Sequence, residues 1–217
     1  MANFKIKSLI IAFAISLFGG LIFSREVSAK SVWVGFKKNS SYNFSQGPGE
    51  RWVSGWDSGR IGCGWVSMNT AYSYLHHKKV SPAIWVKFVK SGQISLKTLN
   101  TGLSNSDFQR YVGKIMKVKR IKISAYEIAK ELYKGNIVVI HGRSLHKKNE
   151  DHSGHYVTIY RAKITVEGKS VKSIDGFCIS DPGYSQYRGK CYSARTIGKF
   201  INNADSGRRA VFVLGKK

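Results

Sequence analysis

The sequence holds three cysteines, and their spacing separates one from the other two. Cys178 and Cys191 are near each other in sequence, at a strand end and in the loop after it, so a disulfide could close that loop. That pairing leaves Cys63 with a free thiol, between Gly62 and Gly64. A helix N-terminus and a nearby imidazolium both favour the thiolate, which is the reactive form. Cys63 is therefore the first candidate for chemistry, although a lone cysteine is often a small buried apolar residue.

Among the six histidines, His155 is the best candidate for a general base. It begins a predicted strand, so the sheet would hold its imidazole in place, as proton transfer requires. Asp181 directly follows the next predicted strand. If strands at 155–164 and 171–180 form a hairpin that turns near 167–168, the register puts His155 almost opposite the residue before Asp181. The two side chains would then meet, and the carboxylate could fix the tautomer of the imidazole.

Gln46 could complete such a site. Its side-chain amide, in a loop before the helix of Cys63, could donate a hydrogen bond to a developing oxyanion, together with the backbone N–H of Cys63. A glutamine in a stretch rich in Ser, Gly and Asn is, on its own, more often an ordinary loop residue.

Hydrophobic periodicity predicts the elements that must position these residues. Apolar side chains at steps of three and four after Cys63 predict one face of an amphipathic helix, with Cys63 at its N-terminus: Trp65, Met68, Tyr72 and Leu75. Further helices are predicted at 84–89, 108–116, 125–133 and 194–203. Strands are predicted at 136–141, 156–164, 171–180 and 209–214. Helices come first and mainly antiparallel strands follow, which indicates an α+β fold.

Together these segments resemble the papain-like cysteine peptidases related to the bacteriocin-leader-processing (double-glycine) peptidases. The likeness runs from about Tyr42 to the C-terminal strand and rests on Gln46 with Arg51-Trp52, Gly62-Cys63-Gly64, Gly154-His155-Tyr156-Val157 and Ser180-Asp181-Pro182. It implies a papain-like fold, with N-terminal helices packed on a mainly antiparallel sheet, and cleavage of amide bonds through a thioester. By the same resemblance Cys63 is the nucleophile and His155 the general base. Asp181 then orients the base, and Gln46 belongs to the oxyanion hole.

The N-terminus has the pattern of a secretory signal peptide. A short basic start is followed by an apolar run from Leu9 to Phe23 and by the small residues Val27-Ser28-Ala29. We expect a signal peptide at 1–29 and a single domain at 30–217, with a secreted or cell-envelope location; an uncleaved membrane anchor is the alternative. Nothing later in the sequence is apolar enough to span a membrane.

The chain is strongly basic, with 36 Lys+Arg against 12 Asp+Glu and a formal net charge of +24. Such a charge favours anionic surroundings, so cell-envelope polymers are possible partners besides a peptide or protein substrate. The basic residues are spread over all segments and form no recognisable binding motif, which argues against a specific nucleic-acid groove. No cofactor is expected.

Three other interpretations remain open. A cell-wall amidase or endopeptidase of similar fold would suit export and positive charge. A non-catalytic binding module could have kept the fold. A metal site could use His152, His155 and Cys63, but this spacing is a poor match to zinc patterns, so no metal is expected.

Overall fold

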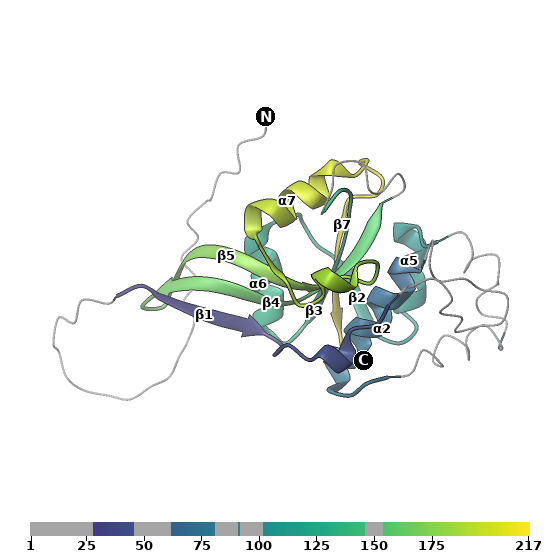
Figure 1. The fold of residues 1–217 in the computed structure, drawn as a ribbon, viewed down its shortest axis with the longest axis horizontal. Helices are drawn as coiled ribbons and strands as arrows, with labels where there is room; N and C mark the ends of the chain where they lie inside the picture. Colours follow the sequence, from purple (N-terminus) through teal and green to yellow (C-terminus); the bar gives the residue numbers. More distant parts are fainter. Residues whose placement is uncertain (1–27, 46–61, 81–90, 92–101, 146–153) are drawn as a thin grey trace.

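The computed structural model describes residues 28–45, 62–80, 91, 102–145 and 154–217. Within these ranges the strands form one seven-stranded antiparallel sheet with helices on both faces (Figure 1). The chain is therefore a mixture of helices and antiparallel sheet, as the sequence predicts. Several expectations fall outside the described residues: most of the signal peptide, the helix at 84–89, Gln46, Arg51-Trp52 and His152.

The sheet order is β2-β7-β3-β4-β5-β6, and β1 pairs with β4 beyond the end of β3. The strands are β1 (Lys30–Gly35), β2 (Lys117–Arg120), β3 (Ile137–Gly142), β4 (His155–Glu167), β5 (Ser170–Ser180), β6 (Cys191–Ser193) and β7 (Ala210–Gly215). The α-helices are α2 (Cys63–His76), α5 (Asn105–Val112), α6 (Ala125–Tyr133) and α7 (Ala194–Asn203), and two short 3₁₀ helices are η1 (Ser40–Tyr42) and η2 (Ser185–Tyr187).

Two hydrophobic layers sandwich the sheet because side chains alternate along each strand. On β3, Ile137 and Val139 face the layer of α2 and α5, whereas Val138 and Ile140 face the layer of α6 and α7. All four side chains are fully buried. The sheet is therefore packed on both faces.

The helix α2 begins at Cys63 as predicted, but the prediction that it is amphipathic is wrong. It is buried nearly all round, including the polar residues Ser67, Asn69, Thr70 and Ser73. Three of these side chains, Ser67, Asn69 and Ser73, have hydrogen bonds with the backbone, which makes their burial less costly. Ser67 donates to the carbonyl of Tyr156 at 3.1 Å, and the Ser67 carbonyl accepts from Thr158 at 3.0 Å. These bonds connect α2 directly to β4.

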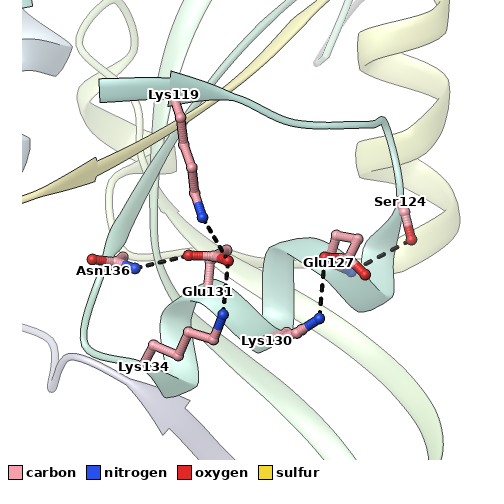
Figure 2. A network of polar contacts seen from close by, with 7 residues as sticks. All are labelled: Lys119, Ser124, Glu127, Lys130, Glu131, Lys134 and Asn136. Carbon is pink, nitrogen blue, oxygen red and sulfur yellow. Dashed lines mark hydrogen bonds and ion pairs between the residues drawn. The ribbon is translucent and has the colours of Figure 1, made fainter. Parts of the chain in front are cut away.

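The N-terminus of helix α6 is capped as its sequence predicts, and the buried carboxylate of Glu131 connects the helix to the sheet. The hydroxyl of Ser124 caps its N-terminus by accepting from the Glu127 N–H. Glu131, only 3% exposed, accepts hydrogen bonds from Lys119 on β2, Lys134 and Asn136 (Figure 2). Burial raises the pKa of Glu131, but these three bonds outweigh it, and the pKa lies below its usual value.

The hairpin of β4 and β5 forms, but its register differs from the predicted one. The last pair is Thr158 with Ser180, and His155 instead pairs with Gly142 of β3. The turn lies at 168–169, one residue later than expected, which alone would put Ser180 opposite residue 157. Irregularities along the hairpin add a net shift of one further residue.

The predicted disulfide between Cys178 and Cys191 is present and joins paired positions of β5 and β6, so Cys63 is the free cysteine. No helix among the described residues is both long and apolar enough to cross a membrane. Three short strands, β1, β2 and β6, were not expected from the sequence. Lys30, the residue after the expected cleavage point, is the first residue of β1.

Candidate active site

Cys63 is the first residue of α2, where the helix backbone offers unpaired N–H groups. The first intrahelical hydrogen bond runs from the Val66 N–H to the Gly62 carbonyl, at 2.9 Å. The N–H of Cys63 therefore has no acceptor within the helix, and Gly62 has no side chain to cap it. Cys63 is half-buried, so its thiol is not sealed in the core. Position and dipole both favour negative charge at this point.

His155 is the first residue of β4 and is only 3% exposed. Its Nε2 lies 2.9 Å from Oδ1 of Asp181, which directly follows β5. The predicted contact between the two side chains is thus present, despite the wrong register. Because Nε2 is engaged by the carboxylate, Nδ1 is the ring nitrogen left to face Cys63.

Asp181 is fully buried and is held by the loop that follows it. Its Oδ1 also accepts the backbone N–H groups of Gly183 at 2.9 Å and Tyr184 at 3.2 Å. The chain after β5 therefore turns back over the carboxylate and holds it beside His155, at the start of β4. Arg188 donates from Nε to the Asp181 carbonyl at 3.2 Å and steadies the same loop.

The pKa of His155 is raised well above its usual value. Burial alone would lower this pKa, but attraction to the Asp181 carboxylate and a hydrogen bond with it act in the opposite direction. A hydrogen bond and charge attraction from Cys63 add to the increase. His155 therefore connects Cys63 to Asp181, and the arrangement favours the imidazolium form of the ring.

The loop around Asp181 also approaches the imidazole from outside. The Tyr184 ring lies edge-on to His155, with ring centroids 6.1 Å apart. A Cβ at Gly183 would come within 3.2 Å of Cε1 of His155, so a glycine lets the backbone pass close to the ring. Sequence reasoning did not select these two residues, although the Gly after Asp-Pro is a turn signal.

A second histidine, His141 on β3, is buried beside this site and was also missed, because it looked like an ordinary strand end. Gln46, the proposed oxyanion donor, lies outside the described residues. So does His152 of the alternative metal site, and the described residues hold no group of three or more potential metal ligands.

Comparisons with known proteins add little to this geometry. No protein-family model matches the chain, and no curated protein matches it. One solved structure, described as that of a proposed C39-like peptidase from Bacillus anthracis, is similar with 13% sequence identity and a TM-score of 0.48. The match covers 86% of this chain and 98% of the other. A functional assignment must therefore come from the arrangement of Cys63, His155 and Asp181.

Proposed function

We propose that this chain is a cysteine peptidase, with Cys63 as nucleophile, His155 as general base and Asp181 as the residue that orients the base. One observation carries the proposal: a buried histidine lies between a half-buried thiol at a helix N-terminus and a fully buried carboxylate. A histidine that only stabilised the fold would need no thiol partner. The three residues together match the nucleophile, base and orienting group of covalent acyl transfer.

In the first half of the reaction the Cys63 thiolate attacks the carbonyl carbon of an amide bond. The negative charge that develops on the carbonyl oxygen is met by the N–H of Cys63 and, in our proposal, by Gln46. The His155 imidazolium then gives its proton to the leaving nitrogen. The C–N bond breaks, the amine leaves, and a thioester with Cys63 remains.

In the second half, neutral His155 takes a proton from water, and the resulting hydroxide attacks the thioester. The C–S bond breaks, and the carboxylic acid is released. The proton returns the imidazole to its charged form beside the Cys63 thiolate. Throughout, Asp181 holds Nε2 so that Nδ1 stays directed at the sulfur.

We also propose a papain-like fold and an exported, extracytoplasmic protein. The placement of the thiol on a helix and of His155 and Asp181 at strand ends supports the first. The disulfide and the apolar N-terminal segment support the second, because disulfides persist in oxidising compartments.

Alkylation by iodoacetamide tests the nucleophile without knowledge of the substrate. The other two cysteines are joined, so one thiol is available, and mass spectrometry locates the label. We expect rapid modification of Cys63 at neutral pH, none in Cys63→Ala, and a loss of at least about 100-fold in rate in His155→Ala. His76→Phe, which changes a histidine stacked on Tyr72 far along α2, is the matched control and should react like the wild type. A Cys63 that reacts no faster than an unfolded thiol would contradict the proposal.

Substrate class is tested by comparing casein and short peptides with purified peptidoglycan. Release of peptide fragments from casein supports a peptidase of general peptide substrates. Release from peptidoglycan alone supports the cell-wall amidase or endopeptidase, which the positive charge also suits. No hydrolysis of any of these, combined with an unreactive Cys63, supports the non-catalytic module.

A further inference from the structure

A second buried histidine lies on the strand next to His155. His141 of β3 is 4% exposed, and it pairs with Tyr156 across the sheet, while the next residue on β3, Gly142, pairs with His155. His141 takes no part in the mechanism proposed above. A buried imidazole is costly unless its polar atoms have partners, so its contacts need an explanation.

The hydrogen bonds of His141 fix its tautomer. Its Nδ1 lies 2.8 Å from Oδ1 of Asn105, the first residue of α5. The amide of Asn105 is oriented in turn, because its Nδ2 donates to the Gly207 carbonyl at 2.9 Å. An amide oxygen only accepts, so Nδ1 of His141 carries the proton and Nε2 has the lone pair.

The ring of His141 packs against the residues on both sides of His155 in the sequence. It stacks on Tyr156, with centroids 4.0 Å apart and planes at 13°. On the other side of His155, Gly154 has φ +93°, and a Cβ there would be 2.5 Å from Nε2 of His141. The backbone at 154 thus fits against the imidazole only as glycine.

Tyr156 is fixed by the same partners. Its hydroxyl lies 3.1 Å from both the Leu103 carbonyl and Oδ1 of Asn105, and its ring stacks with Phe108 at 5.0 Å. His141, Asn105 and Tyr156 therefore form a hydrogen-bonded unit, here named the support triad, that connects α5 to the first residues of β4.

We propose that His141 is a positioning residue for the proposed reaction. Hydrogen-bonded to Asn105 and packed against Gly154 and Tyr156, it holds the backbone on either side of His155. It thereby sets the distance from the His155 imidazole to Cys63. This inference rests on the proposed function. His141 does not contact Cys63 or Asp181 in our scheme, and it acts only through the backbone on either side of His155.

The charge state of His141 agrees with this task. Burial, together with the nearby positive charges of His155 and Arg208, lowers its pKa to about 3. A neutral ring keeps a second cation away from His155, whose imidazolium form the mechanism requires.

Two variants separate the hydrogen bond from the packing. His141→Phe keeps an aromatic ring between Gly154 and Tyr156 but loses the N–H. His141→Asn loses the ring, yet its amide can donate to Asn105 from near the place of Nδ1. Asn105→Ala removes the acceptor from a half-buried position at the start of α5. His76→Phe again serves as the matched control.

The readouts are the iodoacetamide rate of Cys63 between pH 4 and 10, kcat and KM, and the melting temperature. We expect His141→Phe and Asn105→Ala to lower the neutral-pH alkylation rate and kcat by about 10- to 100-fold, with KM nearly unchanged, because the reacting groups are misplaced. His141→Asn should recover part of the loss. A purely structural role would lower the melting temperature and leave the pH profile of alkylation as in the wild type.

Wild-type rate and pH profile in both His141→Phe and Asn105→Ala would overturn the inference, and if His141→Phe does not fold, Asn105→Ala decides. The proposed function is judged separately. If wild-type Cys63 is no more reactive than Cys63 in His155→Ala, the proposed function fails. If that difference is large but the support triad variants behave like the wild type, only the present inference fails.

Discussion

Two carboxylates of this protein, those of Glu131 and Asp181, are similarly buried but accept hydrogen bonds from different kinds of donor. Glu131 is 3% exposed and accepts from two lysines and an asparagine, whereas Asp181 is fully buried and accepts from His155 and two backbone N–H groups. Both carboxylates are well satisfied. The difference lies in what the donors can do next.

The donors of Glu131 are ammonium and amide groups that pass no proton on to a further group. The side chains of Lys119 and Lys134 are about half exposed. Lys119 joins α6 to the edge strand β2, whereas Lys134 belongs to the end of α6 itself (Figure 2). The donor of Asp181 is an imidazole with a second nitrogen, and Cys63 contributes to its raised pKa. A buried carboxylate therefore serves structure when its donors are terminal, and chemistry when its donor can pass on a proton.

The largest effect should follow from removing the donor. His155→Ala should lower kcat/KM by about 10⁴- to 10⁶-fold, because the thiol loses its base and the leaving group its acid. The matched variant at the other carboxylate, Lys119→Ala, should change kcat/KM by less than about twofold, since its side chain is half exposed. Steady-state kinetics on a peptide substrate measures both. A comparable loss in the two variants would erase the distinction between the carboxylates.

Asp181→Asn should have the next largest effect, about 10²- to 10⁴-fold in kcat, because an amide can hold the wrong tautomer of the imidazole. Asp181 raises the pKa of His155, so its removal should lower that pKa and move the alkaline limb of the pH–rate profile to lower pH. The corresponding Glu131→Gln should keep the wild-type profile. An unshifted alkaline limb in Asp181→Asn would mean that the carboxylate does not control His155.

Glu131 should matter for the stability of the fold, although it should not matter for catalysis. Glu131→Gln should lower the free energy of unfolding by about 1 kcal/mol at pH 7, since hydrogen bonds to charged groups are lost while the lysines stay partly hydrated. The pKa of Glu131 is lowered in the folded state, so its contribution is present above its unfolded pKa, near 4.5, and is lost as pH falls through the folded value. Urea unfolding at pH 7 and at acid pH measures this. If Glu131→Gln loses unfolding free energy in acid as steeply as the wild type does, the acid sensitivity comes from other groups.

Gly183→Ala should give the smallest effect. The added Cβ would lie 3.2 Å from Cε1 of His155, a tight contact that the loop can relieve by a small shift. We expect a loss of about two- to tenfold in kcat with little change in stability, since small misplacements near reacting groups are costly. Gly198→Ala on α7, where a Cβ meets nothing within 4 Å, is the control.

Sequence patterns predicted the elements that carry local signals. The Ser124 cap and the turn at Gly135 define α6, and α7 matches its predicted bounds, because caps and periodicity lie within each segment. The charged strand β2 has no such signal: its Lys-Val-Lys-Arg sequence becomes a strand through pairing with β7. Such pairing is a property of the whole sheet and not of four residues.

The candidate site was predicted better than the geometry that supports it. His155 and Asp181 meet as expected, but through the turn of backbone after Ser180 and not through the expected register. The turn lies one residue later than expected, and bulges within the hairpin add a further shift; hydrophobic periodicity reports neither. His141 was not selected from the sequence because its partner Asn105 is distant along the chain and reaches it only in the fold.

The position of the disulfide has a consequence for oxidative folding. Cys178 and Cys191 are 13 residues apart, whereas Cys63 precedes Cys178 by about 115 residues. In an unfolded chain the shorter loop closes more readily, by a factor of about 25 from loop-closure entropy alone. An oxidant acting before the sheet forms would therefore join the two later cysteines first. The spacing of the cysteines thus protects the Cys63 thiol from mispairing before any part of the fold can shield it.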